Sequence, residues 1–180
     1  MKKLLVIFIC MCFSLVIKAQ TNPIDAMFDK YSERDGFTVV SISGRMLSMF
    51  ADSDSDTDPA ENVLSSLKSV RILTVEDSLL NKNLNFYSEL TRKLDISAYE
   101  ELMLIKEGPD ITRFLIQQKG KVITELLVIT GGPGGNSLIS IRGELDLKNI
   151  TNLSKQMGIE DLEELDKIES KKDKKSKFDE

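Results

Sequence analysis

The spacing of apolar residues in this 180-residue chain changes from one end to the other. Before Tyr99, several segments repeat their apolar residues every three or four positions, which is the spacing of one helix face. From Tyr99 onward the apolar residues follow strand-like spacing in four closely spaced runs. The pattern therefore predicts helices interleaved with strands, then consecutive strands, then a last helical region from Leu147 to Ile168.

The first predicted helix begins at Asn22-Pro23, because asparagine caps helices and proline suits the first helical position. One apolar stripe follows, made of Ile24, Met27, Phe28 and Tyr31, and Gly36 ends the segment. Three more helical segments are predicted, over Arg45 to Phe50, from an Asp58 cap through Leu67, and from a Ser78 cap through Leu94.

Two β-branched segments in the first half predict strands, and the four later runs predict four more. The predicted strands are Phe37 to Ser43, Val70 to Val75, Tyr99 to Lys106, Ile111 to Gln118, Val122 to Thr130 and Ser137 to Leu145. Short turns between the last four favour an antiparallel meander, and the run Val122 to Thr130 is apolar on both faces, as central strands are. We therefore expect an α+β fold with a single, mostly antiparallel sheet of about five to six strands and helices packed on it.

The two ends of the chain differ from the middle. Lys2 and Lys3 precede an apolar run from Leu4 to Ile17, and the small Ala19 follows, which is the order of a secretory signal peptide. The alternative is an uncleaved anchor, but the run spans only about 21 Å of a hydrocarbon core about 30 Å thick. The sequence predicts a signal peptide over residues 1–19, one domain over 20–169 and a disordered charged tail over 170–180. A lipoprotein is disfavoured, since Met11 rather than a small residue precedes Cys12.

Removing residues 1–19 leaves a chain with 21 basic and 29 acidic residues and without cysteine, histidine or tryptophan. Such a chain has no disulfides, no serine–histidine–aspartate triad and no zinc site of imidazole and thiolate. Its acidic balance disfavours nucleic acid as a partner. We expect no cofactor, and any metal ion would be a hard cation held by oxygen.

A run of alternating carboxylates suggests a weak calcium site at Asp52, Asp54, Asp56 and Asp58. The rest of an EF-hand loop is missing, because Thr57 stands where the turn requires glycine and Val63 where the bidentate carboxylate belongs. A solvated acidic loop that ends in a helix cap explains the run better.

Two groups of residues are candidates for an interaction surface. The glycine-rich segment from Gly131 to Gly135 lacks the lysine and the following helix of a phosphate-binding loop, and it predicts a flexible hairpin loop. Its residues Gly132, Pro133 and Gly134 could contact a partner. The second group, Met46, Met49 and Phe50, with Met103 elsewhere, could form an adaptable apolar surface, although filling the core is the alternative.

The strand residues Glu125, Arg142 and Glu144 allow two interpretations. Glu125 and Glu144 could act as a catalytic acid and base if folding brought them close enough. The pattern favours an ordinary ion pair between neighbouring strands that faces solvent. Catalysis by lysine and serine is formally open, but no spacing indicates it.

The chain resembles the domain-of-unknown-function 4252 family in five segments that occur in the same order. These segments are Phe37 to Ser43 followed by Arg45 to Met49, then Val70 to Thr74, Tyr99 to Met103, Glu125 to Val128 and Leu138 to Leu147. The resemblance runs from about Ile24 to Met157. It implies a small exported protein of bacteria that have an outer membrane, several relatives being lipid-anchored, with genes often near extracytoplasmic-function sigma factors. It implies no established activity and no catalytic residues.

The sequence and the resemblance together predict a protein exported to the periplasm or the outer membrane that acts by binding rather than by catalysis. The expected partner is an envelope protein or a lipid surface, in an envelope-stress or sigma-factor circuit, and the mature chain is expected to have no transmembrane helix. The alternative function is a hydrolase or lyase that uses carboxylate, lysine or serine residues.

Overall fold

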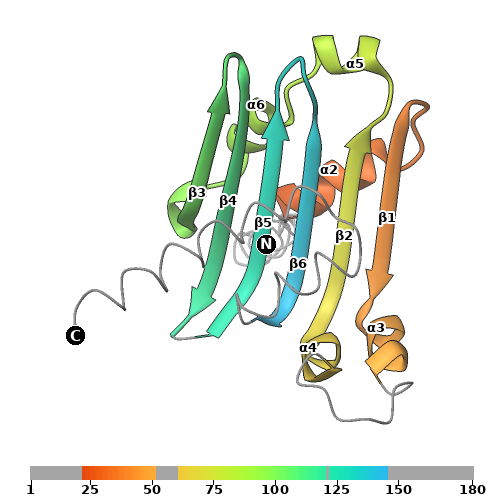
Figure 1. Cartoon of the computed structure of the whole chain (residues 1–180), viewed down its shortest axis with the longest axis vertical. Helices are drawn as coiled ribbons and strands as arrows, with labels where there is room; N and C mark the ends of the chain where they lie inside the picture. Colours follow the sequence, from red (N-terminus) through yellow and green to blue (C-terminus); the bar gives the residue numbers. More distant parts are fainter. Residues whose placement is uncertain (1–21, 52–60, 121, 146–180) are drawn as a thin grey trace, which may run out of the picture.

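Six strands form a single antiparallel sheet in this computed structural model, which describes residues 22–51, 61–120 and 122–145 (Figure 1). The strands are β1 (Phe37–Ser43), β2 (Leu67–Val75), β3 (Glu100–Glu107), β4 (Asp110–Lys119), β5 (Val122–Gly131) and β6 (Ser137–Leu145). Their order across the sheet is β1-β2-β6-β5-β4-β3. The predicted α+β class with one mostly antiparallel sheet is confirmed.

Tight hairpins explain this order. Strands β3 to β6 follow one another as a meander, and β6 then pairs with β2, which leaves β1 and β3 at the two edges. The centre of the sheet is therefore β6 and β5. Leu126, Leu127, Val128 and Ile129 of β5 are all buried, as the prediction of a strand that is apolar on both faces requires.

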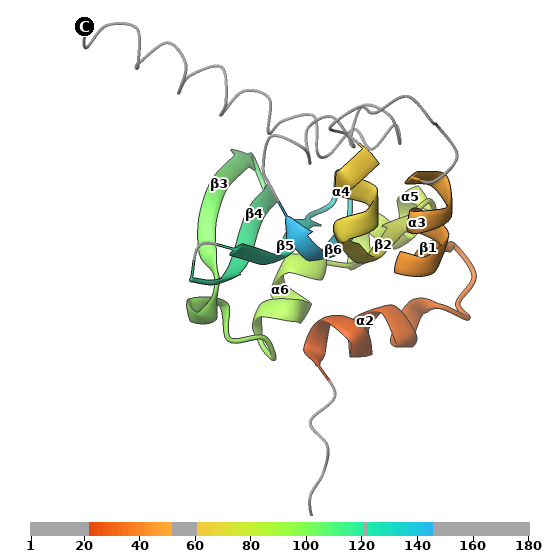
Figure 2. The same ribbon diagram turned by 90° about the horizontal axis from the view of Figure 1, so that it is seen from below.

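Two helices cover one face of the sheet, called here the first face (Figure 2). They are α2 (Pro23–Tyr31) and α6 (Phe86–Thr91), and the predicted apolar stripe of α2 is fully buried against the strands. Tyr31 of α2 stacks on Phe37 with ring centroids 4.5 Å apart, and Phe86 of α6 lies 5.2 Å from Tyr31. Aromatic contacts of this kind add to the apolar packing of both helices against the sheet.

The opposite, second face of the sheet carries α3 (Gly44–Ala51) and α4 (Glu61–Ser66) at its β1–β2 end (Figure 2). Leu47 of α3 is buried there, in one cluster with Val70, Ile139 and Ile141. Five strands, β1, β2, β4, β5 and β6, thus contribute side chains to both of two separate apolar clusters, whereas β3 contributes only to the cluster of the second face.

The predicted helix from Ser78 through Leu94 is wrong, because the chain forms two short helices there. α5 (Ser78–Asn83) is capped by Asp77 rather than by Ser78, and α6 starts afresh after Asn85. Leu84 between them is extended. The Asn85 side chain accepts from the Ser88 N–H at 2.8 Å, and such a cap replaces the backbone bonds that a continuous helix would make. A single-turn 3₁₀-helix, η1 (Ile96–Ala98), follows α6.

Leu67 was also predicted in a helix, but it is the first residue of β2. It pairs with Gly143 of β6 and is buried, so the ladder to β6 overrides the helical spacing. The predicted Asp58 cap, the last helical region and both chain ends lie outside the described residues. Within the described part, none of the helices has the length and apolar character needed to span a bilayer.

Candidate functional site

Polar side chains form a row across three neighbouring strands on the first face of the sheet. The register places Glu125 of β5 opposite Arg142 of β6, and Ser140 of β6 opposite Arg71 of β2. Leu127 and Leu138, on the same face, belong to the apolar cluster beneath α2 and α6. The row therefore lies where the apolar packing of the first face gives way to charged residues.

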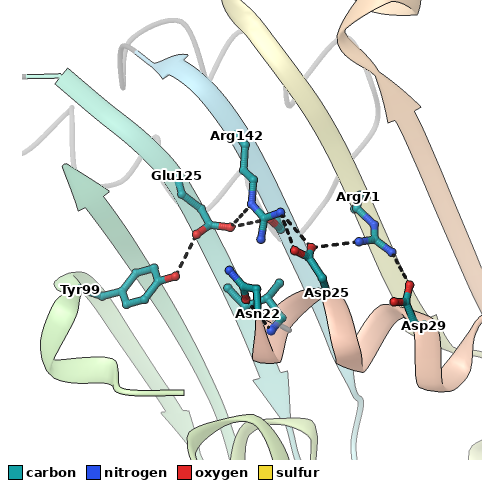
Figure 3. Close-up of polar contacts among 9 residues, drawn as sticks. Asn22, Asp25, Asp29, Arg71, Tyr99, Glu125 and Arg142 are labelled. Carbon is teal, nitrogen blue, oxygen red and sulfur yellow. Dashed lines mark hydrogen bonds and ion pairs between the residues drawn. The ribbon is translucent and has the colours of Figure 1, made fainter. Parts of the chain in front are cut away.

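Helix α2 brings two carboxylates onto this row (Figure 3). Asp25, in its first turn, accepts from Arg142 Nη1 at 2.8 Å and from Arg71 Nη1 at 3.0 Å. Asp29, one turn further along, lies 3.5 Å from Arg71 Nη2. A carboxylate in the first turn also interacts favourably with the helix dipole. Ion pairs therefore hold the start of α2 against the strands.

Glu125 occupies the buried end of the row, with only 4% of its surface exposed. Its carboxylate accepts from Arg142 Nε at 2.7 Å, from the Ser140 hydroxyl at 2.8 Å and from the Tyr99 hydroxyl at 2.8 Å. We refer to Asp25, Asp29, Arg71, Glu125 and Arg142, with Tyr99 and Ser140, as the charged cluster. Its buried carboxylate is matched by donors on three sides, which is what burial of a charge requires.

Burial raises the pKa of the Tyr99 hydroxyl, and the neighbouring Glu125 carboxylate raises that pKa further. Burial alone would lower the pKa of Arg142, but its bonds to Glu125 and Asp25 more than compensate and raise it. At neutral pH both groups therefore keep their protons.

The cluster corrects the interpretation of a solvent-facing ion pair. Glu125 and Arg142 do pair across neighbouring strands, but the pair is largely buried because α2 and the segment at Tyr99 lie over it. Glu144, the suggested catalytic partner of Glu125, is exposed. The lone pairs of Glu125 are already engaged by three donors, so the arrangement fits a structural clamp better than a general base.

A second polar contact joins α2 to α6. Lys30 Nζ lies 2.6 Å from Glu89 Oε1, and the Tyr31 hydroxyl donates to Glu89 Oε2 at 2.7 Å. Burial would raise the pKa of Glu89, but these two bonds lower it. A small hollow of about 20 Å³, which has room for about one water molecule, lies between the two helices.

The two predicted groups of interaction residues lie at opposite ends of the sheet (Figure 1). Met46 and Met49 are on α3, beside the start of β2, and are 52% and 64% exposed. Gly132, Pro133 and Gly134 form the β5–β6 loop, beside the end of β2. Phe50 belongs to α3, but its side chain is outside the described residues, and Met103 is half-buried against the cluster of the second face. No single surface can therefore use both groups.

Two glycines of the β5–β6 loop, Gly132 and Gly134, are required by close contacts with Asp110. A Cβ on Gly132 would meet Asp110, and the Gly134 N–H donates to Asp110 Oδ1 at 2.8 Å. Gly132 is buried, whereas Pro133 and Gly134 are exposed. The loop is thus fixed to the start of β4 on one side and can offer only its tip to a partner.

The calcium candidates Asp52, Asp54, Asp56 and Asp58 lie outside the described residues. Within the described ranges, no three or more acidic side chains gather in a way that could hold a metal ion.

Sequence reasoning named Glu125 and Arg142 but missed Asp25, Arg71 and Tyr99. One signal was present in the sequence, because Glu125 is a charged residue within a strand and its neighbours two positions away, Ile123 and Leu127, are both apolar. A charge at an inward position of such a strand predicts a buried partner. It does not say which helix supplies that partner.

The raised pKa of Tyr99 predicts that the folded protein becomes less stable at alkaline pH. A group whose pKa is higher in the folded state than in the unfolded state stabilises the fold at pH values below its unfolded-state pKa. For tyrosine the unfolded-state pKa is about 10, and the stabilisation from Tyr99 is lost as the pH rises above that value. We expect the free energy of unfolding to fall above about pH 10, by up to about 1.4 kcal/mol per pH unit for each proton involved. Urea unfolding of the wild type and of Tyr99→Phe from pH 8 to 11 tests this, since the variant should show a shallower decline. Identical slopes would show that Tyr99 does not contribute.

The fold and the charged cluster define a small α+β protein in which a six-stranded antiparallel sheet holds an N-terminal helix by ion pairs. The family model described as "Domain of unknown function (DUF4252)" matches residues 31–153. The chain belongs to this family, as the resemblance in its strand segments indicated. No match was found among curated proteins or among solved structures.

Proposed function

We propose that the chain is an exported protein of the cell envelope that acts by binding, and that α3 carries the binding surface. The observation that supports this is the exposure of two methionines on a helix that is otherwise anchored by the buried Leu47. Methionine is flexible and polarizable, so a pair of methionines can adapt to an apolar surface. Exposed apolar side chains that lie close together are typical of sites for protein or membrane contact.

The N-terminal segment supports the proposed location in the envelope. Its basic start, apolar run and small residue at Ala19 have the order of a cleaved signal peptide. In the periplasm or at the outer membrane, the partner is another envelope protein or a lipid surface. An envelope-stress or sigma-factor circuit, which the gene context of similar proteins suggests, would reach the cytoplasm through a membrane partner.

Site-specific photo-crosslinking in intact cells tests this proposal. A photoreactive amino acid at Met46 should yield a reproducible crosslinked product in the envelope fraction. The same amino acid at Leu79 of α5, which is 67% exposed and lies at the other end of the sheet, is the matched control and should not yield it. Equal products from both positions would contradict a binding surface on α3, and recovery of the chain in the cytoplasmic fraction would contradict export.

Replacing both methionines with aspartate separates binding from folding. Because Met46 and Met49 are exposed, Met46→Asp with Met49→Asp should change the free energy of unfolding by no more than about 0.5 kcal/mol. The crosslinked product should be lost, with the probe placed at Arg45 for this comparison. Flotation with liposomes of envelope lipids distinguishes a lipid partner from a protein partner. If the partner is a lipid surface, the wild type should bind the liposomes and the double variant should not. Unchanged crosslinking by the double variant would contradict the proposal.

A further inference from the structure

The edge strand β1 has one side without a partner among the described residues. Gly36 O accepts from Glu76 N–H at 3.1 Å, one register step before the pair formed by Phe37 and Val75. In an antiparallel ladder, hydrogen-bonded pairs alternate with non-hydrogen-bonded pairs. The even-numbered residues of β1 therefore direct their main-chain groups toward β2, and the odd-numbered residues from Phe37 to Ser43 direct theirs away from the sheet.

Strand β1 lacks the features that prevent an edge strand from pairing with a strand of another molecule. The sequence Phe-Thr-Val-Val-Ser-Ile-Ser contains no charge and no proline, and its register with β2 has no irregularity. The opposite edge, β3, is protected, since four of its eight residues are charged and its pairing with β4 contains a register shift. Long, regular edges without charge are those that add another strand.

We propose that β1 pairs with β1 of a second copy of this chain, antiparallel and about a twofold axis at Val40. This inference concerns assembly and goes beyond the binding role proposed for α3. In this register Val39 lies opposite Ser41 of the second copy, and Phe37 lies opposite Ser43. These four are the residues whose main-chain groups point outward, so each donor meets an acceptor. The two sheets become one continuous sheet.

The side chains also fit this register. Val40 is 40% exposed and lies on the second face of the sheet, where it would pack against Val40 of the second copy. Thr38 would lie opposite Ile42, on the same face. A strand with no charge brings no like charges together when it meets its own copy.

Charges just beyond the two ends of β1 favour a second copy over an unrelated strand. Asp35 precedes β1 and Arg45 follows it, both are exposed, and neither forms an ion pair with another described residue. Antiparallel pairing about Val40 brings Asp35 of each copy near Arg45 of the other. Opposite charges at both ends would fix the register and the direction of pairing.

The experiment measures the mass of the protein in solution by sedimentation and light scattering. The full-length gene is expressed in its native host, and the protein is purified in the form that the cells produce. The wild type should be a dimer. Val40→Lys and Val40→Glu should each be monomeric, with a dimer dissociation constant raised at least about tenfold, because each places like charges on the twofold axis. An equimolar mixture of the two variants should form the dimer again, since lysine then meets glutamate.

Leu104→Lys is the matched control, since Leu104 is 44% exposed on the other edge strand. It should leave the dimer intact, and circular dichroism should show that all three variants stay folded. Exchanging the end charges by Asp35→Arg with Arg45→Asp should keep the dimer, whereas either single change should weaken it. A wild type that stays monomeric up to millimolar concentration would overturn the proposal. So would a dimer that is lost in the Leu104→Lys control, or one that the Val40 variants do not affect.

Discussion

Replacing Glu125 with leucine should lower the free energy of unfolding by about 3–5 kcal/mol, which is the usual cost of removing one partner from a buried ion pair. Leucine cannot accept the bonds from Arg142, Tyr99 and Ser140, so a largely buried guanidinium and two hydroxyls lose their acceptor. The penalty arises mainly from the groups left behind and not from the lost attraction. Urea unfolding at pH 7 measures it.

Two variants serve as controls for this result. Glu125→Gln keeps an acceptor of the same shape, so it should lose only about 1–2 kcal/mol. Glu101→Leu removes the partner of Arg113 at 3.0 Å, but this pair lies near the surface and should lose at most about 1 kcal/mol. If Glu125→Leu were no worse than Glu101→Leu, the charged cluster would not clamp the helix.

The large loss of stability expected for Glu125→Leu follows from the position of the charged cluster between α2 and the sheet. Asp25 connects α2 to two strands at once, through Arg71 of β2 and Arg142 of β6. Because α2 also supplies Phe28 and Tyr31 to the apolar cluster of the first face, loosening its start exposes apolar surface. The electrostatic and apolar contributions of α2 are therefore coupled, and their losses should not be additive.

The strands could be predicted from the sequence because their signals are local. Phe37 to Ser43 and Ser137 to Leu145 are found where the β-branched and apolar runs place them, since strand propensity and turn residues act within a few positions. The central place of β5 followed from side chains that are apolar on both faces. The antiparallel meander followed from short turns.

The parts that the sequence did not predict depend on contacts between distant residues. Asp25 meets Arg142 across 117 positions, and no pattern near either residue indicates this pairing. The burial of Glu125 depends in the same way on α2 and Tyr99, so a residue expected to face solvent is covered. The break between α5 and α6 is a third case, because Asn136 supplies an acceptor to Phe86 from fifty positions away.

Replacing Asn136 with alanine should lower the free energy of unfolding by about 3 kcal/mol, because this residue joins three parts of the chain. Its side-chain oxygen accepts from the Phe86 N–H at 2.7 Å, where α6 begins. Its amide donates to Gly132 O at 2.9 Å and to Asn81 Oδ1 at 3.0 Å. Asn136 is buried, so alanine would leave several polar groups in the interior without partners, and each costs about 1–3 kcal/mol before relaxation.

The loss should be local as well as global. Hydrogen exchange should show faster exchange at the first amides of α6, because Phe86 loses the acceptor that holds the helix start, while β3 and β4 should be unchanged in native conditions. Asn83→Ala is the matched control, since Asn83 is exposed and bonds only within α5 among the contacts of the described residues. It should cost no more than about 0.5 kcal/mol. If the two alanine variants were equally stable, Asn85 alone would set the break between α5 and α6. The contact that Asn136 makes with Phe86 would then be a consequence of the fold and not one of its causes.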